Sequence, residues 1–323
     1  MFNLHVRTLL AAACLCVAAM GQAEDADRVP RLMRIIVPFS PGGSNDLIAR
    51  AVAPALAKRL GNAIIVENRP GAAGVIGADA VAKAPADGSV LLLSSSSFLT
   101  AAATQPRAPF DPVDSFAPVA MIAEGPLLLA VPASAAIKSP AELLAAARSK
   151  PGVMTYGSSG IGSVAQLATE LLSADAKLQL LHVPYKGAAN ALLDLTSGQI
   201  DMMMSNYSSL APQIKSGKVR PLAVTSINAS PVFPDLPPLS VTVPGYAIDI
   251  WVGVLAPRGT SHGLIERLNR EINEVSVSPE VRTLLDPDGA QPSSMSPASY
   301  ATRLKADYAQ WKRIASERNI VVE

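Results

Sequence analysis

Two glycine- and serine-rich turns carry the residues whose types and spacing could hold an anion. The first turn follows an apolar run and reads Phe39-Ser40-Pro41-Gly42-Gly43-Ser44-Asn45-Asp46. Glycines permit positive φ and let a ligand approach bare backbone, and Ser44 is suited to cap a helix that begins there. Free N–H groups and the positive end of the helix dipole would then face the turn, which predicts a seat for an anionic group.

The second turn has the same design and reads Gly157-Ser158-Ser159-Gly160-Ile161-Gly162-Ser163, again between an apolar run and a helical stretch. Ser163 is the expected helix cap. Either turn alone could be an ordinary connection between a strand and a helix. Two such turns are more informative, because ligands of open α/β sheets bind at the carboxyl ends of strands and clefts between lobes are common small-molecule sites.

Cations are scarce near both turns. No Lys or Arg occurs in residues 39–46, 94–100 or 157–166, so backbone amides and hydroxyls would have to hold an acid in place of an arginine clamp. The nearest candidate cation is Lys186, which could equally be a solvated turn residue. Asp46 could orient the first turn or a ligand amine. Alternatively, its negative charge could simply interact favourably with the positive end of the dipole of its own helix.

Signatures of catalysis are weak. Residues 160–165 match a dinucleotide-binding fingerprint, but the following strand ends in His182-Val183-Pro184 without the acid that binds a ribose. No nucleophile elbow surrounds Ser158 or Ser159, and no Walker A sequence occurs. A serine nucleophile would also lack a base, because neither His182 nor His262 belongs to a turn by sequence. We therefore predict no catalytic residue, no metal site and no cofactor.

The elements that must position the turns alternate between short apolar runs and longer amphipathic stretches, which is typical of α/β proteins. The predicted strands are Met33–Pro38, Ala63–Glu67, Ser89–Ser94, Phe116–Ala123, Leu127–Val131, Val153–Gly157, Gln179–Val183, Ile200–Met204, Val219–Ser226 and Ile248–Ala256. The predicted helices are Ser44–Leu60, Pro140–Ser149, Ser163–Ala174, Ala188–Thr196, Thr260–Val275 and Pro297–Ala315. The runs are almost continuously apolar, which favours parallel strands covered on both faces. Two lobes, each a mostly parallel sheet flanked by helices, fit this pattern better than one doubly wound domain.

The N-terminus is typical of a secretory signal peptide over residues 1–23. Arg7 precedes the apolar run Leu9–Met20, which is too short to span a bilayer, and small residues follow it. A lipoprotein modified at Cys14 or Cys16 is the alternative. Both cysteines of the chain lie in this segment, so a chain cleaved near Ala23 would have none, which suits an oxidising periplasm. Cleavage would also remove Arg7 and no acid, which takes the formal charge from +1 to zero and gives no support for binding nucleic acid.

Short pieces spread over the chain carry a family resemblance. They include residues 36–46 around Pro41-Gly42-Gly43, residues 66–77 around Glu67-Asn68-Arg69-Pro70-Gly71, residues 156–163, His182-Val183-Pro184-Tyr185-Lys186-Gly187, and Gly198-Gln199-Ile200-Asp201. Together they resemble the Bug-type solute-binding proteins of tripartite tricarboxylate transporters. The resemblance implies a two-lobed periplasmic-binding-protein fold of type II (Venus flytrap). Its expected division is lobe 1 over 24–126 and 227–323, lobe 2 over 127–226, and a hinge near Glu124–Val131 and Leu222–Asn228.

The resemblance also implies a function and a site. A small organic acid, aromatic acid or acidic amino acid would bind between the lobes of a periplasmic monomer and pass to the membrane subunits of a transporter. A periplasmic sensor that signals to a histidine kinase is the alternative. The expected ligand-binding residues are Phe39, Gly42, Gly43, Ser44, Asn45, Asp46, Ser95, Ser96, Ser158, Ser159, Gly162, Ser163, Gln166 and Lys186.

Three positions depart from the pattern of that family. Asn45 stands where Thr is frequent, Gln166 where His is common and Asn190 where Pro is usual. These departures leave the identity of the ligand open. Gln166 also removes a titratable group, so a pH-sensitive contact is expected to be absent at the second turn.

Overall fold

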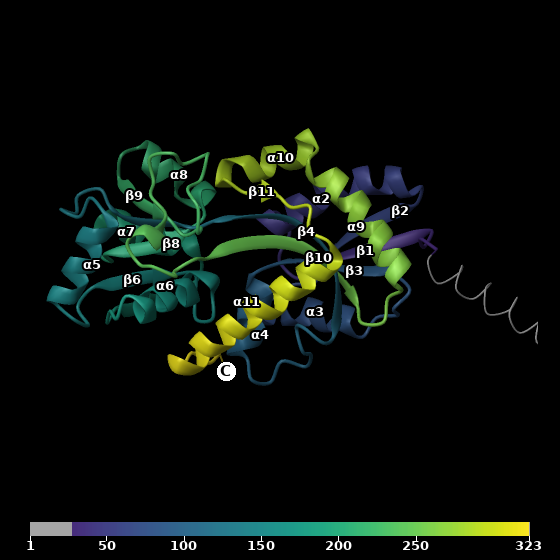
Figure 1. The fold of residues 1–323 in the computed structure, drawn as a ribbon, viewed down its shortest axis with the longest axis horizontal. Coiled ribbons are helices and arrows are strands. Elements are labelled where there is room, and N and C mark those ends of the chain that lie inside the picture. The colour runs from purple at the N-terminus through teal and green to yellow at the C-terminus, as the bar shows by residue number, and fades with distance from the viewer. Residues whose placement is uncertain (1–27, 323) are drawn as a thin grey trace, which may run out of the picture.

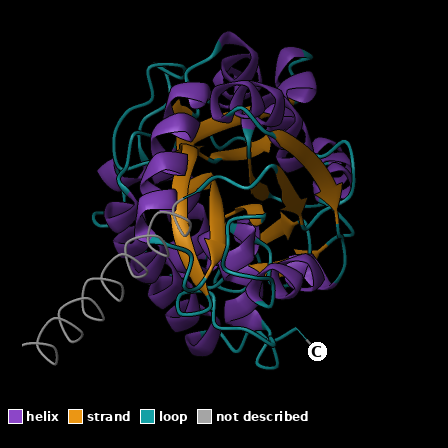
Figure 2. Ribbon diagram, turned by 90° about the vertical axis from the view of Figure 1, so that its right-hand side faces the viewer, coloured by secondary structure: helices purple, strands orange, loops and turns teal. Residues whose placement is uncertain are grey.

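Two β-sheets lie side by side in the computed structural model, which describes residues 28–322 (Figure 1). Each sheet is covered by helices on both faces, as the view along the long axis shows (Figure 2). The predicted signal peptide lies outside the described residues. The α/β, two-lobed fold predicted from the sequence is confirmed at this level.

The first sheet has six strands in the order β11-β4-β10-β3-β1-β2. Their bounds are β1 (Leu32–Val37), β2 (Ala63–Asn68), β3 (Val90–Ser95), β4 (Phe116–Pro126), β10 (Asp249–Pro257) and β11 (Gln291–Pro292). One face packs on α2 (Ser44–Leu60), α9 (His262–Ser276) and α10 (Pro279–Leu285). The other face packs on α3 (Val75–Ala82), α4 (Ser97–Thr104) and α11 (Pro297–Glu317).

The second sheet has five strands in the order β7-β6-β8-β5-β9. Their bounds are β5 (Leu128–Pro132), β6 (Thr155–Ser158), β7 (Leu181–Pro184), β8 (Met202–Ser205) and β9 (Val219–Val224). Helices α5 (Pro140–Ser149) and α6 (Val164–Asp175) contribute to the core on one face. Helices α7 (Ala188–Ser197) and α8 (Tyr207–Lys215) pack on the other face.

Both sheets are mixed, whereas the sequence predicts mostly parallel ones. Only β2-β1-β3 and β7-β6-β8 are parallel, and the remaining pairs are antiparallel. The reason is the path of the chain between the lobes. Strand β5 continues from β4 and β10 enters from the other lobe, so each arrives in its sheet reversed. An apolar run indicates that a strand is buried, but it does not indicate the direction in which the strand runs.

Two segments cross between the sheets beside each other. Leu127 joins β4 to β5, and Thr225 follows β9 on the return path. The Thr225 N–H donates to the Leu127 carbonyl at 2.9 Å, and the Leu127 N–H donates to Thr225 Oγ1 at 2.7 Å. The Ile248 N–H then donates to the Thr225 carbonyl at 2.8 Å, immediately before β10. The two crossings are therefore hydrogen-bonded to each other.

The long return between β9 and β10 packs on the second sheet's side of the molecule. The Tyr246 hydroxyl donates to the Ala168 carbonyl of α6 at 3.1 Å, and the Phe233 ring lies 5.3 Å from that of Tyr207. The predicted division placed residues 227–248 with the first lobe. The lobe boundaries stay a prediction.

Helix α11 runs along the junction and contacts both lobes (Figure 1). Near its end the Arg318 guanidinium pairs with Glu170 of α6 at 3.4 Å, and the Val322 N–H donates to the Thr104 carbonyl of α4 at 2.8 Å. Side chains of both sheets share one core cluster beneath it. The C-terminal segment is thus a third link between the lobes.

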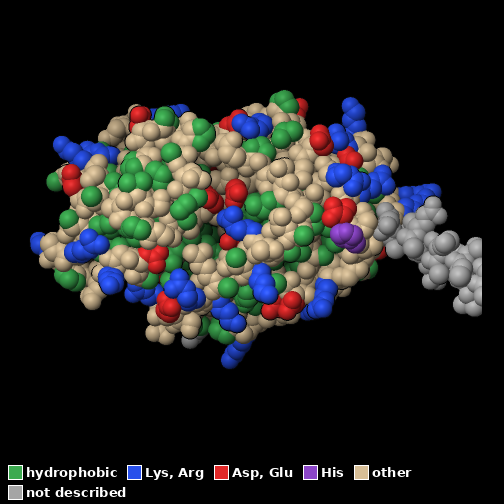
Figure 3. Space-filling model, viewed as in Figure 1, with side chains coloured by type: hydrophobic (Ala, Val, Ile, Leu, Met, Phe, Trp, Pro, Cys, Tyr) green, Lys and Arg blue, Asp and Glu red, His purple; other side chains and the backbone are tan. Residues whose placement is uncertain are grey.

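The surface shows no concentration of one charge on the face in Figure 3, where acidic and basic side chains are interspersed. Within residues 28–322, none of the helices has the length and apolar character needed to cross a bilayer.

Candidate ligand-binding site

The two glycine-rich turns occupy equivalent places in the two lobes. One joins β1 to α2 and the other joins β6 to α6, and each strand is the middle one of its three parallel strands. Both turns therefore lie at the carboxyl end of a central strand, where α/β sheets bind their ligands.

The first turn is shaped by Asp46. Its carboxylate accepts the Gly42 N–H at 2.9 Å, Arg50 Nε at 3.0 Å and Asn68 Nδ2 at 2.9 Å. Gly42 has φ +85°, which glycine adopts without strain. The hydrogen bond from Arg50, followed by that from Gly42, lowers the pKa of Asp46 to about 2 against the opposing effect of burial. Asp46 is therefore ionised at neutral pH, and its oxygens hold the turn.

The cap of α2 is Gly43 and not Ser44 as predicted. Gly43 has extended backbone angles of φ −77° and ψ 165°, and Ser44 is already the first helical residue. No side chain accepts a hydrogen bond as the cap of this helix. Gly42, Gly43 and Ser44 are all exposed, so the backbone of the turn is open to solvent.

The second turn is shaped by Gln166, which occupies the same helical position as Asp46. Its Oε1 accepts the Gly162 N–H at 2.7 Å, four residues back, as Asp46 accepts from Gly42. Ser163 is the N-cap as predicted, and its Oγ accepts the Gln166 N–H at 3.3 Å. Gly162, with φ +78°, is buried against Thr104 of α4 and Val322 of the C-terminal segment.

A histidine lies beside this turn, although the sequence pointed to none. Strand β7 pairs with β6 so that His182 is opposite Tyr156, and the two rings stack with centroids 4.8 Å apart. His182 Nε2 lies 2.7 Å from Ser158 Oγ, and Nδ1 lies 3.1 Å from Gln166 Nε2. Burial lowers the pKa of His182 below its ordinary value of 6.5. Two expectations are thus wrong: a titratable group does contact the second turn, and a histidine is within reach of Ser158.

A cavity of about 230 Å³ lies between the lobes. Four predicted site residues line it: Ser95, Ser96, Ser159 and Ser163. The first turn meets it only indirectly, since Asn45 Nδ2 donates to Ser95 Oγ at 3.3 Å and Ser95 Oγ lies 2.8 Å from Ser97 Oγ.

The other predicted residues are not among those that line the cavity. Phe39 packs beside Gly74, Ser158 is a fully buried residue of the second turn, and Lys186 is exposed. The ligand-binding role of these residues stays a prediction.

The cavity wall contains residues that the sequence did not single out. They are Ser97, Leu127, Val164, Ala165, Ala188, Met203, Met204, Ser205, Asn206 and Ile250. Ser97 directly follows the predicted site residues Ser95 and Ser96. Ser205 ends β8 and Asn206 follows it, just as Ser95 ends β3 and Ser97 lies two residues beyond it. The equivalence of the two lobes was therefore the available signal.

Four helices begin at the cavity. Ser97 is the first residue of α4, Val164 and Ala165 open α6, Ala188 opens α7, and Asn206 is the N-cap of α8. The first N–H groups of a helix lack intrahelical partners, and the positive end of its dipole favours an anion. No charged side chain is among the residues that line the cavity. The wall can therefore hold an anion through backbone amides and serine hydroxyls.

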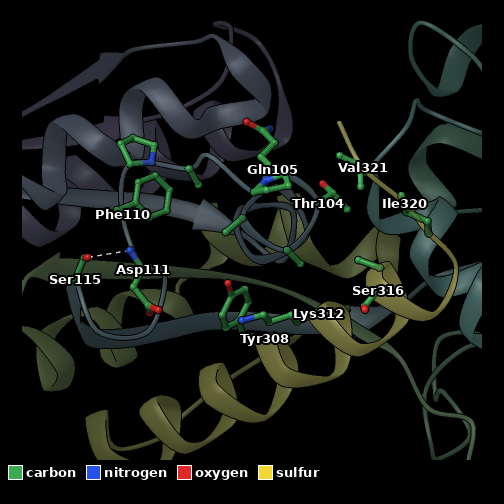
Figure 4. A pocket seen from close by; sticks show the side chains of 16 residues that line it. Thr104, Gln105, Phe110, Asp111, Ser115, Tyr308, Lys312, Ser316, Ile320 and Val321 are labelled. Atoms are coloured by element: carbon green, nitrogen blue, oxygen red, sulfur yellow. Dashed lines mark hydrogen bonds between the residues drawn. The ribbon is translucent and has the colours of Figure 1, made fainter. Parts of the chain in front are cut away.

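A larger hollow of about 730 Å³ lies elsewhere, between the end of α4, the loop over residues 105–115 and α11 (Figure 4). Tyr308 and Lys312 of α11 face Phe110 and Asp111 across it (Figure 4). It contains no predicted site residue and only one end of it meets the second turn, through Thr104. Despite its size, it lacks converging helix N-termini. Among the described residues, no cluster of metal-ligating side chains occurs.

Two mixed sheets joined by paired crossings, with a cavity between them, define the fold of a periplasmic solute-binding protein. A family model described as "Tripartite tricarboxylate transporter family receptor" (TctC) matches residues 48–320. The chain belongs to this family, whose members are periplasmic binding proteins, and the resemblance drawn from the sequence is confirmed.

Several relatives agree over nearly the whole chain. Protein BugT of Bordetella pertussis is 35% identical over 97% of this chain and 98% of its own. A protein from the tcbD-tcbE intergenic region of Pseudomonas sp. is 36% identical over 98% of this chain and 95% of its own. The solved structure of the periplasmic binding protein BugD has a TM-score of 0.73 at 29% identity, covering 91% of this chain and 99% of that one.

Two other solved structures contain a dicarboxylate. An R. palustris protein with adipate is 34% identical, has a TM-score of 0.75 and is matched over 90% of this chain and 98% of that one. MatC from Rhodopseudomonas palustris with bound malate is 30% identical, has a TM-score of 0.73 and is matched over 88% and 98%. Carboxylates are therefore ligands of close structural neighbours.

Proposed function

We propose that this chain is exported to the periplasm, where as a monomer it captures a small carboxylate between its lobes and delivers it, unaltered, to the membrane subunits of a tripartite tricarboxylate transporter. The observation that carries the proposal is the meeting of four helix N-termini at one cavity without a charged side chain in its wall. Such a wall favours an anion through dipoles and N–H groups. The adipate and malate in the neighbouring structures support the same class of ligand.

The size of the cavity favours a small acid. Sites for drug-sized ligands occupy roughly 300–1,000 Å³, and this cavity of about 230 Å³ is below that range. Dicarboxylates, small aromatic acids and acidic amino acids remain the candidate ligands. Closure of the lobes on the ligand would be a shift of population toward the state that binds it better.

Thermal unfolding of residues 24–323 with malate, adipate, benzoate, aspartate and glucose tests the ligand class. A ligand present at 100 times its Kd stabilises the folded state by about 2.7 kcal/mol, so at least one acid should raise the Tm and glucose should not. Mass spectrometry of the recovered acid should show no turnover. A shift with glucose and with none of the acids would overturn the proposal.

A matched pair of variants at Ala165 tests the seat. Ala165 lies in the cavity wall in the first turn of α6, where an acidic side chain is favourable for the helix. Ala165→Asp should therefore fold and yet abolish the shift with acids, because its carboxylate takes the place of the ligand's. Ala165→Asn, of equal size and without charge, should keep part of the shift. Equal shifts in both variants would remove the cavity from consideration as the anion seat.

A further inference from the structure

The second turn is held by a chain of hydrogen bonds whose direction can be assigned throughout. The Gly162 N–H lies 2.7 Å from Gln166 Oε1, and a backbone N–H can only donate. This contact therefore fixes the orientation of the Gln166 amide. The Gln166 Nε2 then faces His182 Nδ1 at 3.1 Å as a donor.

The same direction continues through the imidazole. Because Nδ1 accepts, the proton of a neutral His182 is on Nε2, which donates to Ser158 Oγ at 2.7 Å. The Ser158 hydroxyl in turn donates to the Gly160 carbonyl at 3.0 Å. The chain thus ties both ends of the turn, at Gly160 and at Gly162, to one histidine on the neighbouring strand.

This direction separates positioning from catalysis. A histidine that activates a serine must accept the serine's proton. Here His182 donates to Ser158, and the serine hydroxyl is engaged with the carbonyl of its own turn. Ser158 is also fully buried. The arrangement is built to hold the turn.

We propose that His182 is a positioning residue that keeps the second turn in its ligand-binding shape through Gln166 and Ser158, and that protonation of its imidazole releases the turn and weakens ligand binding. The first part concerns the chain alone. The second part rests on the proposed function, because it requires a ligand on the turn that carries Ser159 and Ser163.

Protonation disrupts the chain because it adds a donor where an acceptor is needed. In the imidazolium both ring nitrogens donate, so Nδ1–H faces the Gln166 NH₂ group. If the amide turns over, Oε1 meets Nδ1–H but the NH₂ group then faces the Gly162 N–H. In either arrangement two donors oppose each other. The turn must move, or one group must lose its partner.

The surroundings of His182 do not offset this effect. On β6 the Tyr156 ring stacks on the imidazole, and its hydroxyl donates to Glu170 of α6 at 2.5 Å. Glu170 is paired with Arg318 from the end of α11. On the other side of the strand, the Tyr185 hydroxyl is engaged with Asp194 of α7 at 2.6 Å. The other carboxyl of α6 is Asp175, at the opposite end of that helix from Gln166. Burial keeps the pKa of His182 below 6.5.

The proton position is testable without any ligand. Beyond residue 23 the chain has only His182 and His262, and His262 is exposed, so residues 24–323 with His262→Gln hold a single imidazole. Its ¹⁵N chemical shifts should show the proton on Nε2 at neutral pH and a titration midpoint below 6.5. The Gly160 and Gly162 amide resonances should follow the same midpoint. The first part would be overturned by a proton on Nδ1. It would also be overturned if the chemical shifts of the two glycine amides did not change as His182 titrates.

Gln166→Glu should reverse the pH dependence of ligand affinity. A merely structural role of His182 would not produce this reversal. A carboxylate at residue 166 can accept from Gly162 and from a protonated His182 at once, so acid completes the chain in this variant. The wild type should bind malate or adipate about tenfold more weakly at pH 5 than at pH 8, a change that corresponds to the ~1.4 kcal/mol of one decade in Kd. Relative to the wild type, Gln166→Glu should gain affinity as pH falls from 8 to 5. The same ligand is compared in both proteins, so the ionisation of the ligand itself cancels.

His182→Asn is the third protein, because it removes the titrating ring and keeps a polar side chain. Its affinity should not change with pH beyond the change due to the ligand. Parallel pH profiles in all three proteins would overturn the second part of the proposal. If no acid binds to any of them at any pH, the proposed ligand class fails instead, and the glycine amides still decide whether His182 holds the turn.

Discussion

The β1–α2 turn and the β6–α6 turn solve one geometric problem with different chemistry. In each, the side chain at the third position of the helix reaches back to the N–H of a glycine with positive φ, Asp46 to Gly42 and Gln166 to Gly162. The first turn uses an ionised carboxylate with Arg50 and Asn68, and the second uses a neutral amide with His182. The glycine of the first turn, Gly42, is open to solvent, whereas Gly162 of the second is buried against Thr104 and Val322.

The difference shows that the stability of two equivalent turns can depend on pH in different ways. The pKa of Asp46 is lowered to about 2, so its contribution to stability is present above its ordinary value of 3.8 and is lost only as pH falls through the folded value. His182 is held neutral, and its lowered pKa means that the unfolded chain takes up a proton first as pH falls below 6.5. As pH falls below 6.5, the contribution of His182 to stability therefore decreases, while that of Asp46 is kept down to its ordinary value of 3.8.

Gly162→Ala should have the largest effect on stability. A Cβ at this position would lie 2.6 Å from Thr104 Oγ1 and 2.9 Å from Val322 Cγ2, on a backbone with φ +78°. Overpacking and the left-handed conformation together should lower the free energy of unfolding by about 3 kcal/mol. At Gly42 the same change meets open space, so Gly42→Ala should cost about 1–2 kcal/mol. Equal midpoints in urea for the two variants would mean that Gly162 is not packed against Thr104 and Val322 as described.

Asp46→Ala should have the next largest effect. It leaves the Gly42 N–H, Asn68 and Arg50 without their common acceptor, and bonds to a charged group contribute about 2 kcal/mol to stability. Gln166→Ala removes neutral bonds and should cost about 1 kcal/mol. Urea unfolding at neutral pH measures both. A larger loss from Gln166→Ala would reverse the ranking of the two networks.

Ser163→Ala and Ser44→Ala test the capping difference. Ser163 caps α6 through its side chain, and its removal should cost about 1 kcal/mol. Ser44 is inside α2 and caps nothing, so Ser44→Ala should change the free energy of unfolding by less than about 0.5 kcal/mol. Helix-sensitive circular dichroism during thermal unfolding provides the comparison, and a marked loss from Ser44→Ala would contradict the assignment of Gly43 as the cap.

Gly43→Ala should also have only a small effect on stability. Gly43 has φ −77°, and the nearest atom to a new Cβ is the Ser40 carbonyl oxygen at 3.6 Å, so a cost of about 0.5 kcal/mol is expected for the poorer cap. Gly43→Val should fold almost as well but lose affinity for the acid if the first turn contacts the ligand when the lobes close. If titration calorimetry shows the same affinity for Gly43→Val as for the wild type, ligand binding is confined to the wall formed by α4, α6, α7 and α8.

The elements that support the turns were largely predictable because their signals are local. Apolar runs and flanking Gly and Ser placed β1, β3 and β6 to within a few residues and α2 at Ser44–Leu60 as observed. Helix α4 was not predicted, since Ser97–Thr104 is short and rich in Ser, Thr and Ala and contains no periodic polar face. Most of its residues are buried, and packing in the core stabilises it more than its own propensity does.

The site was only half predictable because its contacts depend on strand order. Ser158 and His182 are far apart in sequence, and only the parallel pairing of Tyr156 with His182 brings them together. A crossover of the β6-α6-β7 type would have indicated that pairing, but hydrophobicity alone does not give the register. The same is true of Ser205 and Asn206, whose place in the cavity wall follows from β8 being the third parallel strand.

The buried Trp251 of β10 has a further consequence. Its N–H donates to Ser96 Oγ in the cavity wall at 2.8 Å, and its indole donates to Asp307 of α11 at 3.0 Å. The chain has only one other tryptophan, Trp311, which is also buried and lies on α11, the helix that contacts both lobes. Both tryptophans are thus at the junction of the lobes. Their fluorescence, excited in the indole band, should therefore report lobe motion directly. No attached dye is needed, and no other tryptophan adds background.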